Sequence, residues 1–108
     1  MTDGRKAIAE ETSLELHRCV AERLRAEPSL VGRARERVGG WLREGTVSRP
    51  LAEAWSTLLA QPLEDVTAFL TDSSERARHM RQASPFAGIL DPRTRWAIWR
   101  RLHPLPRS

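Results

Sequence analysis

Residues 50–70, PLAEAWSTLLAQPLEDVTAFL, decide the fold class of this chain. Proline is favoured in the first turn of a helix, because the backbone N–H groups there make no hydrogen bond within the helix. Pro50 and Pro62 therefore predict the starts of two short helices. Each helix carries apolar residues at helical spacing along one side. These residues are Leu51, Ala54, Trp55 and Leu58 in the first helix and Leu63, Val66, Phe69 and Leu70 in the second. Runs of alternating β-branched residues are absent from the chain, which predicts an all-helical fold.

Towards the N-terminus, two more helices are predicted. TSLE places Thr12 and Glu15 at capping-box spacing, so the first helix is expected to start at Thr12 and to stop near Glu27. A second helix is expected from Ser29 to Gly45, because glycine favours the end of a helix. Gly39 and Gly40 disfavour a helix interior, so the pair predicts a kink or a close approach by another backbone.

Towards the C-terminus, two further helices complete the prediction. DSSE, with Asp72 and Glu75, reads as a second capping box for a fifth helix, and Asp91 followed by Pro92 predicts the start of a sixth helix that ends before Pro104. The fold class is therefore all-α, a single small domain of about six short helices. We expect a flexible tail over residues 1–11, the helical domain over residues 12–104 and a second tail over residues 105–108.

Composition narrows the classes of protein. The 108 residues fit one domain, and no run approaches the roughly 18 apolar residues that a spanning helix needs. The start, MTDGRKAIAEET, lacks the apolar centre of a signal peptide, which predicts a cytoplasmic protein. A single cysteine, Cys19, excludes an internal disulfide and leaves no zinc-binding spacing, so no metal or other cofactor is expected.

Charge is divided unevenly along the chain. Residues 1–75 hold ten basic and thirteen acidic side chains, whereas residues 76–108 hold eight arginines against Asp91 alone. Seventeen of the eighteen basic residues are arginine, a bias that a GC-rich genome would also produce. Guanidinium groups nevertheless suit pairing with carboxylates and phosphates.

This basic third also contains most of the candidate binding residues. In SPFAGILDPRTRWAIWRRL, residues 84–102, a turn-rich apolar segment leads into an amphipathic helix with two tryptophans. Aromatic residues and arginine are enriched at the centres of protein interfaces, so we expect a protein partner here. The candidate anchors are Phe86, Trp96 and Trp99, and the candidate steering or carboxylate-pairing groups are Arg76, Arg81 and Arg95. The alternative is that the tryptophan face of this helix docks into the core of its own domain.

The same residues also fit other functions. Clustered arginines with aromatic residues also suit the binding of nucleic acid. Residues 42–55 resemble a helix-turn-helix, although the helix that would read DNA carries Arg49 followed by Glu53 and no further basic residue. His17, His79 and His103 are scattered, with no cysteine, serine or carboxylate at a spacing that suggests a relay, so no enzyme is predicted. His17 is expected to be a satisfied core or boundary residue.

A family resemblance follows from short motifs in the last third. Residues 70–102 resemble small helical bacterial proteins, some of them encoded beside toxin genes, through MRQ at 80–82, SPFAG at 84–88 and DPRTRW at 91–96. HRCVAERL at residues 17–24 is more weakly similar. The resemblance implies an antitoxin-like protein that neutralises a cognate toxin by covering its active site or substrate groove. The sequence departs from autoregulating antitoxins in one respect, because it contains no separate DNA-binding strand or arm of the kind typical of them.

Overall fold

The structure of the protein is a computed structural model in which residues 4–103 are described. Every regular element in this range is a helix, which confirms the all-α prediction. The helices are α1 (Gly4–Ala26), α2 (Leu30–Glu44), α3 (Arg49–Leu59), α4 (Leu63–Leu70), α5 (Glu75–Arg81) and α6 (Pro92–Leu102). The tail expected over residues 105–108 lies outside the described range.

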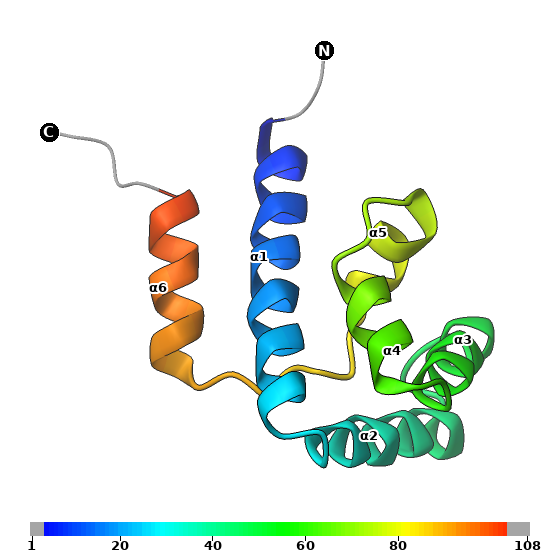
Figure 1. Ribbon diagram of the computed structural model, residues 1–108. Coiled ribbons are helices and arrows are strands. Elements are labelled where there is room, and N and C mark those ends of the chain that lie inside the picture. Colours follow the sequence, from blue (N-terminus) through cyan, green and yellow to red (C-terminus); the bar gives the residue numbers. More distant parts are fainter. Residues whose placement is uncertain (1–3, 104–108) are drawn as a thin grey trace, which may run out of the picture.

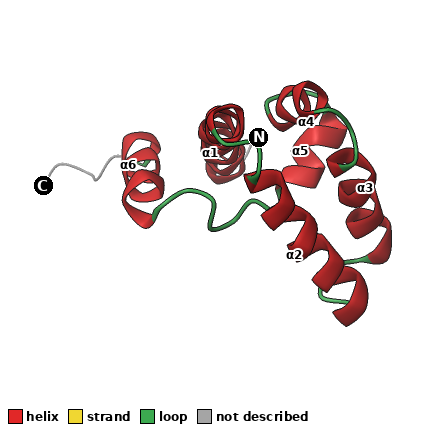
Figure 2. Ribbon diagram, turned by 60° about the horizontal axis from the view of Figure 1, so that its bottom comes forward, coloured by secondary structure: helices red, strands yellow, loops and turns green. Residues whose placement is uncertain are grey.

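Helix α1 is the central element of the fold (Figure 1). Helices α4 and α5 pack against one side of it and α6 lies antiparallel to it on the other side, while α2 crosses beneath its C-terminal end and pairs with α3. Figure 2 shows the same separation from a second direction, with α6 set apart from α2–α5 and joined to them by the long connection between α5 and α6. As a result, α6 has one covering neighbour, α1, and an open outer side.

The core lies between α1 and the α2–α5 group and is centred on Trp55, which is completely buried. The Trp55 ring meets Phe69 edge-on at 6.3 Å between centroids and Phe86 at 6.1 Å, which is a favourable aromatic geometry. Helices α2, α3 and α4 supply much of the remaining core, although on α3 the residues buried beside Trp55 are Ala52 and Leu59, while the predicted Leu51, Ala54 and Leu58 are half-buried. Its fully buried members include Leu24, Ala34, Ala52, Leu59, Val66 and Leu70.

Two predicted helix starts are wrong. Helix α1 begins at Gly4 rather than Thr12, so residues 4–11, expected to belong to a tail, are helical. Thr12 is an interior helical residue whose Oγ1 donates to the carbonyl of Ile8 at 2.7 Å. At α5 the cap is Ser74 rather than Asp72, because the Ser74 hydroxyl accepts from the backbone N–H of Ala77 at 3.1 Å.

Glycines act at the end of α2 rather than in its middle. Gly45 ends α2 with φ of 70°, and its N–H donates to the Trp41 carbonyl at 2.8 Å, as predicted. Helix α2 runs without interruption through Gly39 and Gly40. A side chain at Gly39 would meet the Arg43 side chain and no foreign backbone, so the predicted close approach by another backbone is wrong.

Candidate functional site

Helix α6 carries three aromatic rings in one row on the outside of the molecule. Trp96 and Trp99 stack with 5.1 Å between ring centroids and 10° between planes, and Trp99 and His103 stack with 4.5 Å and 7°. Trp96 is 57% exposed and Trp99 is 39% exposed. We call Trp96, Trp99 and His103 the aromatic stack. Large exposed aromatic side chains are typical of binding surfaces.

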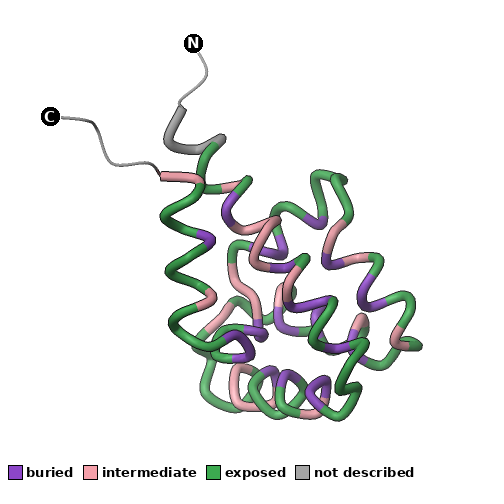
Figure 3. Tube along the Cα trace, turned by 60° about the vertical axis from the view of Figure 1, so that its left-hand side comes forward, coloured by how far each residue is buried: buried purple, intermediate pink, exposed green. Residues whose placement is uncertain are grey.

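The stack is exposed because α6 uses a different side to contact α1. Ile98 is the buried residue of α6, and Leu102 is half-buried one turn later. Asp91 caps the helix by accepting from the Thr94 N–H at 2.7 Å and its hydroxyl at 3.1 Å, as predicted. The alternative in which the tryptophans dock into the core is therefore wrong. Figure 3 shows the consequence, since most of the α6 trace is exposed.

A shallow groove runs between α1 and α6 beside the aromatic stack. Its volume is about 330 Å³, and it is lined by Thr12, Leu16, Pro92, Arg95, Trp96 and Trp99. The tryptophans form its α6 wall, and Leu16 contributes the apolar part of its α1 wall. The groove extends the aromatic stack into a continuous surface that spans two helices.

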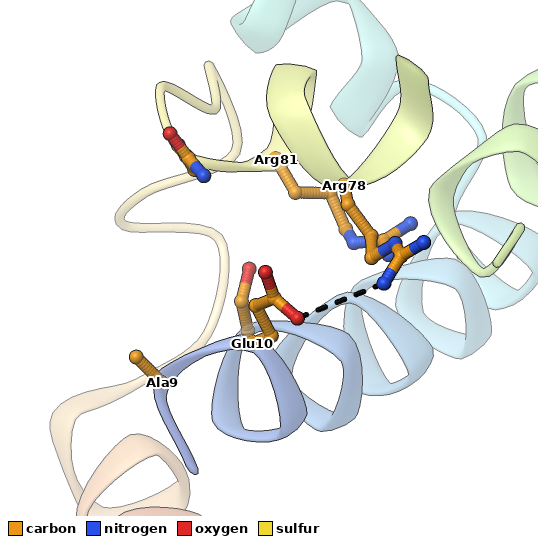
Figure 4. Close-up of a pocket in the computed structure, with 6 residues that line it drawn as sticks. Ala9, Glu10, Arg78 and Arg81 are labelled. Carbon is orange, nitrogen blue, oxygen red and sulfur yellow. Dashed lines mark ion pairs between the residues drawn. The ribbon is translucent and has the colours of Figure 1, made fainter. Parts of the chain in front are cut away.

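Part of the basic third of the chain is neutralised by α1. Arg101 on α6 pairs with Glu15 at 3.1 Å, and Arg78 on α5 pairs with Glu10 at 3.8 Å, as the dashed line in Figure 4 shows. These exposed pairs contribute at most about 1 kcal/mol each.

Three arginines of α6 are exposed to solvent and are not paired with a carboxylate of any described residue. They are Arg93, Arg95 and Arg100. In a helix, Arg93 and Arg100 lie three residues before and four residues after Trp96, so they border the aromatic stack on its outer side. Arg95 lines the groove on the other side. The stack is thus bordered by guanidinium groups on both sides.

Two predicted partner-binding residues belong to the fold instead. Phe86 is 3% exposed and packs on Trp55, so its ring is not available as an anchor. Arg81 is 5% exposed and donates from Nη1 to the carbonyls of Leu70 at 3.2 Å and Asp72 at 2.7 Å. It thus satisfies the carbonyl of Leu70, the last residue of α4, which has no partner within that helix, and the carbonyl of Asp72 in the loop that follows.

Arg76 is exposed, as a binding residue should be, but it lies on α5. Helix α5 is on the opposite side of α1 from α6 (Figures 1 and 2). The structure therefore brings Arg95, Trp96 and Trp99 together on one surface and leaves Arg76 outside it.

A buried contact that the sequence did not reveal joins His17 to Ser84. His17 Nδ1 donates to the Ser13 carbonyl at 2.7 Å, so in the neutral ring Nε2 accepts from the Ser84 hydroxyl at 2.8 Å. Ser84 Oγ also accepts from the N–H of Phe86 at 3.2 Å. His17 is buried with both ring nitrogens bonded, which confirms the prediction of a satisfied histidine. The contact fixes the connection between α5 and α6 onto α1.

The environment of His17 makes stability depend on pH. Burial lowers its pKa below the usual 6.5, the bond to Ser13 opposes this shift, and the charge of Arg81 adds to it. The unfolded chain thus takes up a proton at a higher pH than the folded chain does. The free energy of unfolding is therefore not reduced by His17 at a pH above its unfolded-state pKa, and it decreases as the pH falls through that pKa.

We therefore expect the melting temperature to fall as the pH is lowered from 7.5 towards the folded-state pKa of His17, and His17→Gln to weaken that dependence. Thermal melts at a series of pH values, followed by circular dichroism, measure it. His79→Gln is the matched control because His79 is exposed on α5. An unchanged pH dependence in His17→Gln would contradict the assignment.

The described residues contain no metal-binding cluster, no thiol with a lowered pKa and no membrane-spanning helix. Within residues 4–103, no three histidine, cysteine, aspartate or glutamate side chains converge as metal ligands would. Burial raises the pKa of the Cys19 thiol, and the nearby Glu22 and Glu15 act in the same direction, so the thiol stays protonated at neutral pH. No described helix is both long enough and apolar enough to cross a membrane.

Helices α2 and α3 form the helix-turn-helix outline expected from residues 42–55, with Gly45 in the turn. The basic residue at the start of α3 is compensated, because Arg49 Nε donates to Glu53 Oε1 at 2.9 Å. Helix α3 contains no other basic residue. Its exposed side therefore offers little attraction to phosphate.

The resemblance to antitoxin-like proteins rests on segments with two different structural roles. SPFAG lies in the connection before α6 and buries Pro85 and Phe86, whereas DPRTRW forms the cap and first turns of α6 and exposes Trp96. The antitoxin-like assignment itself stays a prediction. Comparison with protein-family models, with curated proteins and with solved structures finds no match to this chain.

Proposed function

We propose that this chain is a non-enzymatic, cytoplasmic protein-binding module that uses α6 to bind an acidic surface of a partner protein. The single observation that carries the proposal is the exposed aromatic stack bordered by Arg93, Arg95 and Arg100. Fully desolvated tryptophans supply most of the binding free energy at such interfaces, while peripheral charges speed the encounter. In keeping with the resemblance of residues 70–102, we propose that the partner is a toxin encoded by a neighbouring gene.

The stacking geometry favours protein over single-stranded nucleic acid. Base binding uses the open face of an aromatic ring. Trp99 is stacked between Trp96 and His103, so its ring faces are turned towards these two rings and a base cannot stack on Trp99. What the stack offers instead is a row of ring edges and an apolar groove, a surface that suits the side chains of a protein.

Trp96→Ala and Trp99→Ala are each expected to weaken partner binding by about tenfold or more, because each removes a large apolar anchor. The measurement is co-expression with the product of the adjacent gene, followed by calorimetric titration of the purified components and a growth-rescue assay. Leu42→Ala is the matched control, since Leu42 is 39% exposed, like Trp99, but lies at the far end of α2.

Two outcomes would contradict the proposal. If the adjacent gene product forms no stoichiometric complex and growth is not rescued, the antitoxin role fails. If the chain instead binds single-stranded DNA with an affinity that falls steeply with salt, and Trp96→Ala abolishes this binding, the nucleic-acid alternative is correct.

A further inference from the structure

A second cleft lies between α1, the connection that joins α5 to α6 and Arg95 of α6, and it shares Leu16 and Arg95 with the groove beside the aromatic stack. Its volume is about 380 Å³, within the range of small-molecule sites. One wall is apolar and consists of Leu16, Val20, Trp41, Phe86 and Leu90.

The polar groups of this cleft are basic or neutral. Arg81 and Arg95 both line it, and no aspartate or glutamate does. The Arg81 guanidinium bonds to two carbonyls, and neither arginine forms an ion pair with a described residue. His17 and Ser84 satisfy one another at 2.8 Å. A ligand entering this cleft therefore meets apolar carbon and two guanidinium groups: Arg81 lies near the carboxylates of Asp72 and Glu10, whereas Arg95 has no ion-pair partner among the described residues.

Two neighbouring clefts lack this combination. The cleft between α1 and α5 in Figure 4 shares Arg81 with this one and also contains Arg78, but Glu10 lies in it and pairs with Arg78. The cleft between α1 and the start of α6 is lined by Glu22 and Asp91 beside Arg23. Carboxylates already present would repel an anionic ligand in both places.

We propose that the cleft lined by Val20, Phe86 and Arg95 binds a small amphipathic carboxylate, a ligand class independent of the partner proposed for α6. The alkyl or aromatic body lies against the apolar wall, and the carboxylate pairs with Arg95, whose exposed guanidinium stands at the cleft and matches carboxylate geometry. Arg81 adds positive charge from the α5 side. A neutral ligand is disfavoured because it would leave the Arg95 guanidinium without a partner.

The test is calorimetric titration of the full chain with octanoate, hexanoate and 1-octanol. Octanoate is expected to bind saturably at one site, and more tightly than hexanoate because each buried methylene adds about fourfold in affinity. 1-Octanol, which has the same chain without the charge, is expected to bind about tenfold more weakly or worse. Equal affinities for octanoate and 1-octanol, or no saturable binding, would overturn the proposal.

Variants locate the site. Arg95→Gln is expected to reduce octanoate affinity by about tenfold, while Arg93→Gln, an exposed arginine of the same helix outside the cleft, leaves it unchanged. Ala87→Trp places a large ring in the cleft from an exposed position and is expected to abolish binding. Equal losses in the two arginine variants, or undiminished binding by a folded Ala87→Trp, would show that octanoate binds elsewhere. Trp96→Ala leaves this affinity unchanged, so failure here is distinct from failure of the partner proposal.

Discussion

Phe86→Ala is expected to lower the free energy of unfolding by about 3–5 kcal/mol, the usual cost of removing a buried phenyl ring. Phe86 is 3% exposed, and its ring meets Trp55 with 6.1 Å between centroids and 74° between planes. Alanine would leave a cavity beside Trp55 and weaken the attachment of the α5–α6 connection to the core. Urea denaturation at constant pH measures the change.

Trp96→Ala is the matched control for Phe86→Ala, because it removes an aromatic ring of the same part of the chain from an exposed position. Its expected cost is below about 1 kcal/mol, since an exposed ring loses little buried area. If Phe86→Ala instead kept the parental midpoint and lost partner binding, Phe86 would be an interface anchor, contrary to its burial. The two variants thus separate the core from the binding surface.

Helices α2, α3, α4 and α6 were predictable because their signals are local. Gly45 ends α2 and Asp91 caps α6 through contacts with residues no more than four positions away. The apolar spacing on α3 likewise placed Trp55 in the core. Such features depend on neighbouring residues in the chain, which sequence reasoning sees directly.

The start of α1 was missed because a capping-box pattern is not confined to helix ends. Thr12 and Glu15 have the right spacing, but the Thr12 hydroxyl is satisfied by the preceding turn and the helix continues to Gly4. The Asp72 assignment failed for a related reason, since DSSE offers more than one capping residue and Ser74 takes the role.

The candidate site was only partly predictable because burial depends on packing between distant segments. Phe86, Trp96 and Trp99 look alike as aromatic residues in a basic third of the chain. They are separated by tertiary structure: Phe86 packs next to Trp55 in the core, while α6 buries Ile98 and half-buries Leu102 and leaves Trp96 and Trp99 exposed. The His17–Ser84 bond joins residues 67 positions apart, so no local pattern could have indicated it.

Trp55→Ala is expected to lower the free energy of unfolding by about 3–5 kcal/mol, whereas Trp99→Ala, the same change on α6, should cost clearly less. Trp55 is 0% exposed and contacts Phe69 and Phe86 edge-on, so its loss removes packing from α3, α4 and the α5–α6 connection together. Trp99 loses mainly its stacking on Trp96 and His103. Equal destabilisation in the two variants, measured by urea denaturation, would contradict the placement of α6 outside the core.

Trp55→Phe refines this prediction because the Trp55 ring carries a polar atom. No described residue accepts a hydrogen bond from the buried Trp55 Nε1–H, and such an unsatisfied donor costs about 1–3 kcal/mol. Phenylalanine removes that donor and keeps most of the ring, so the cost of the smaller side chain is partly offset. We therefore expect Trp55→Phe to be clearly more stable than Trp55→Ala. A phenylalanine variant as unstable as the alanine variant would show that the full indole volume, rather than the aromatic contacts with Phe69 and Phe86, holds this core together.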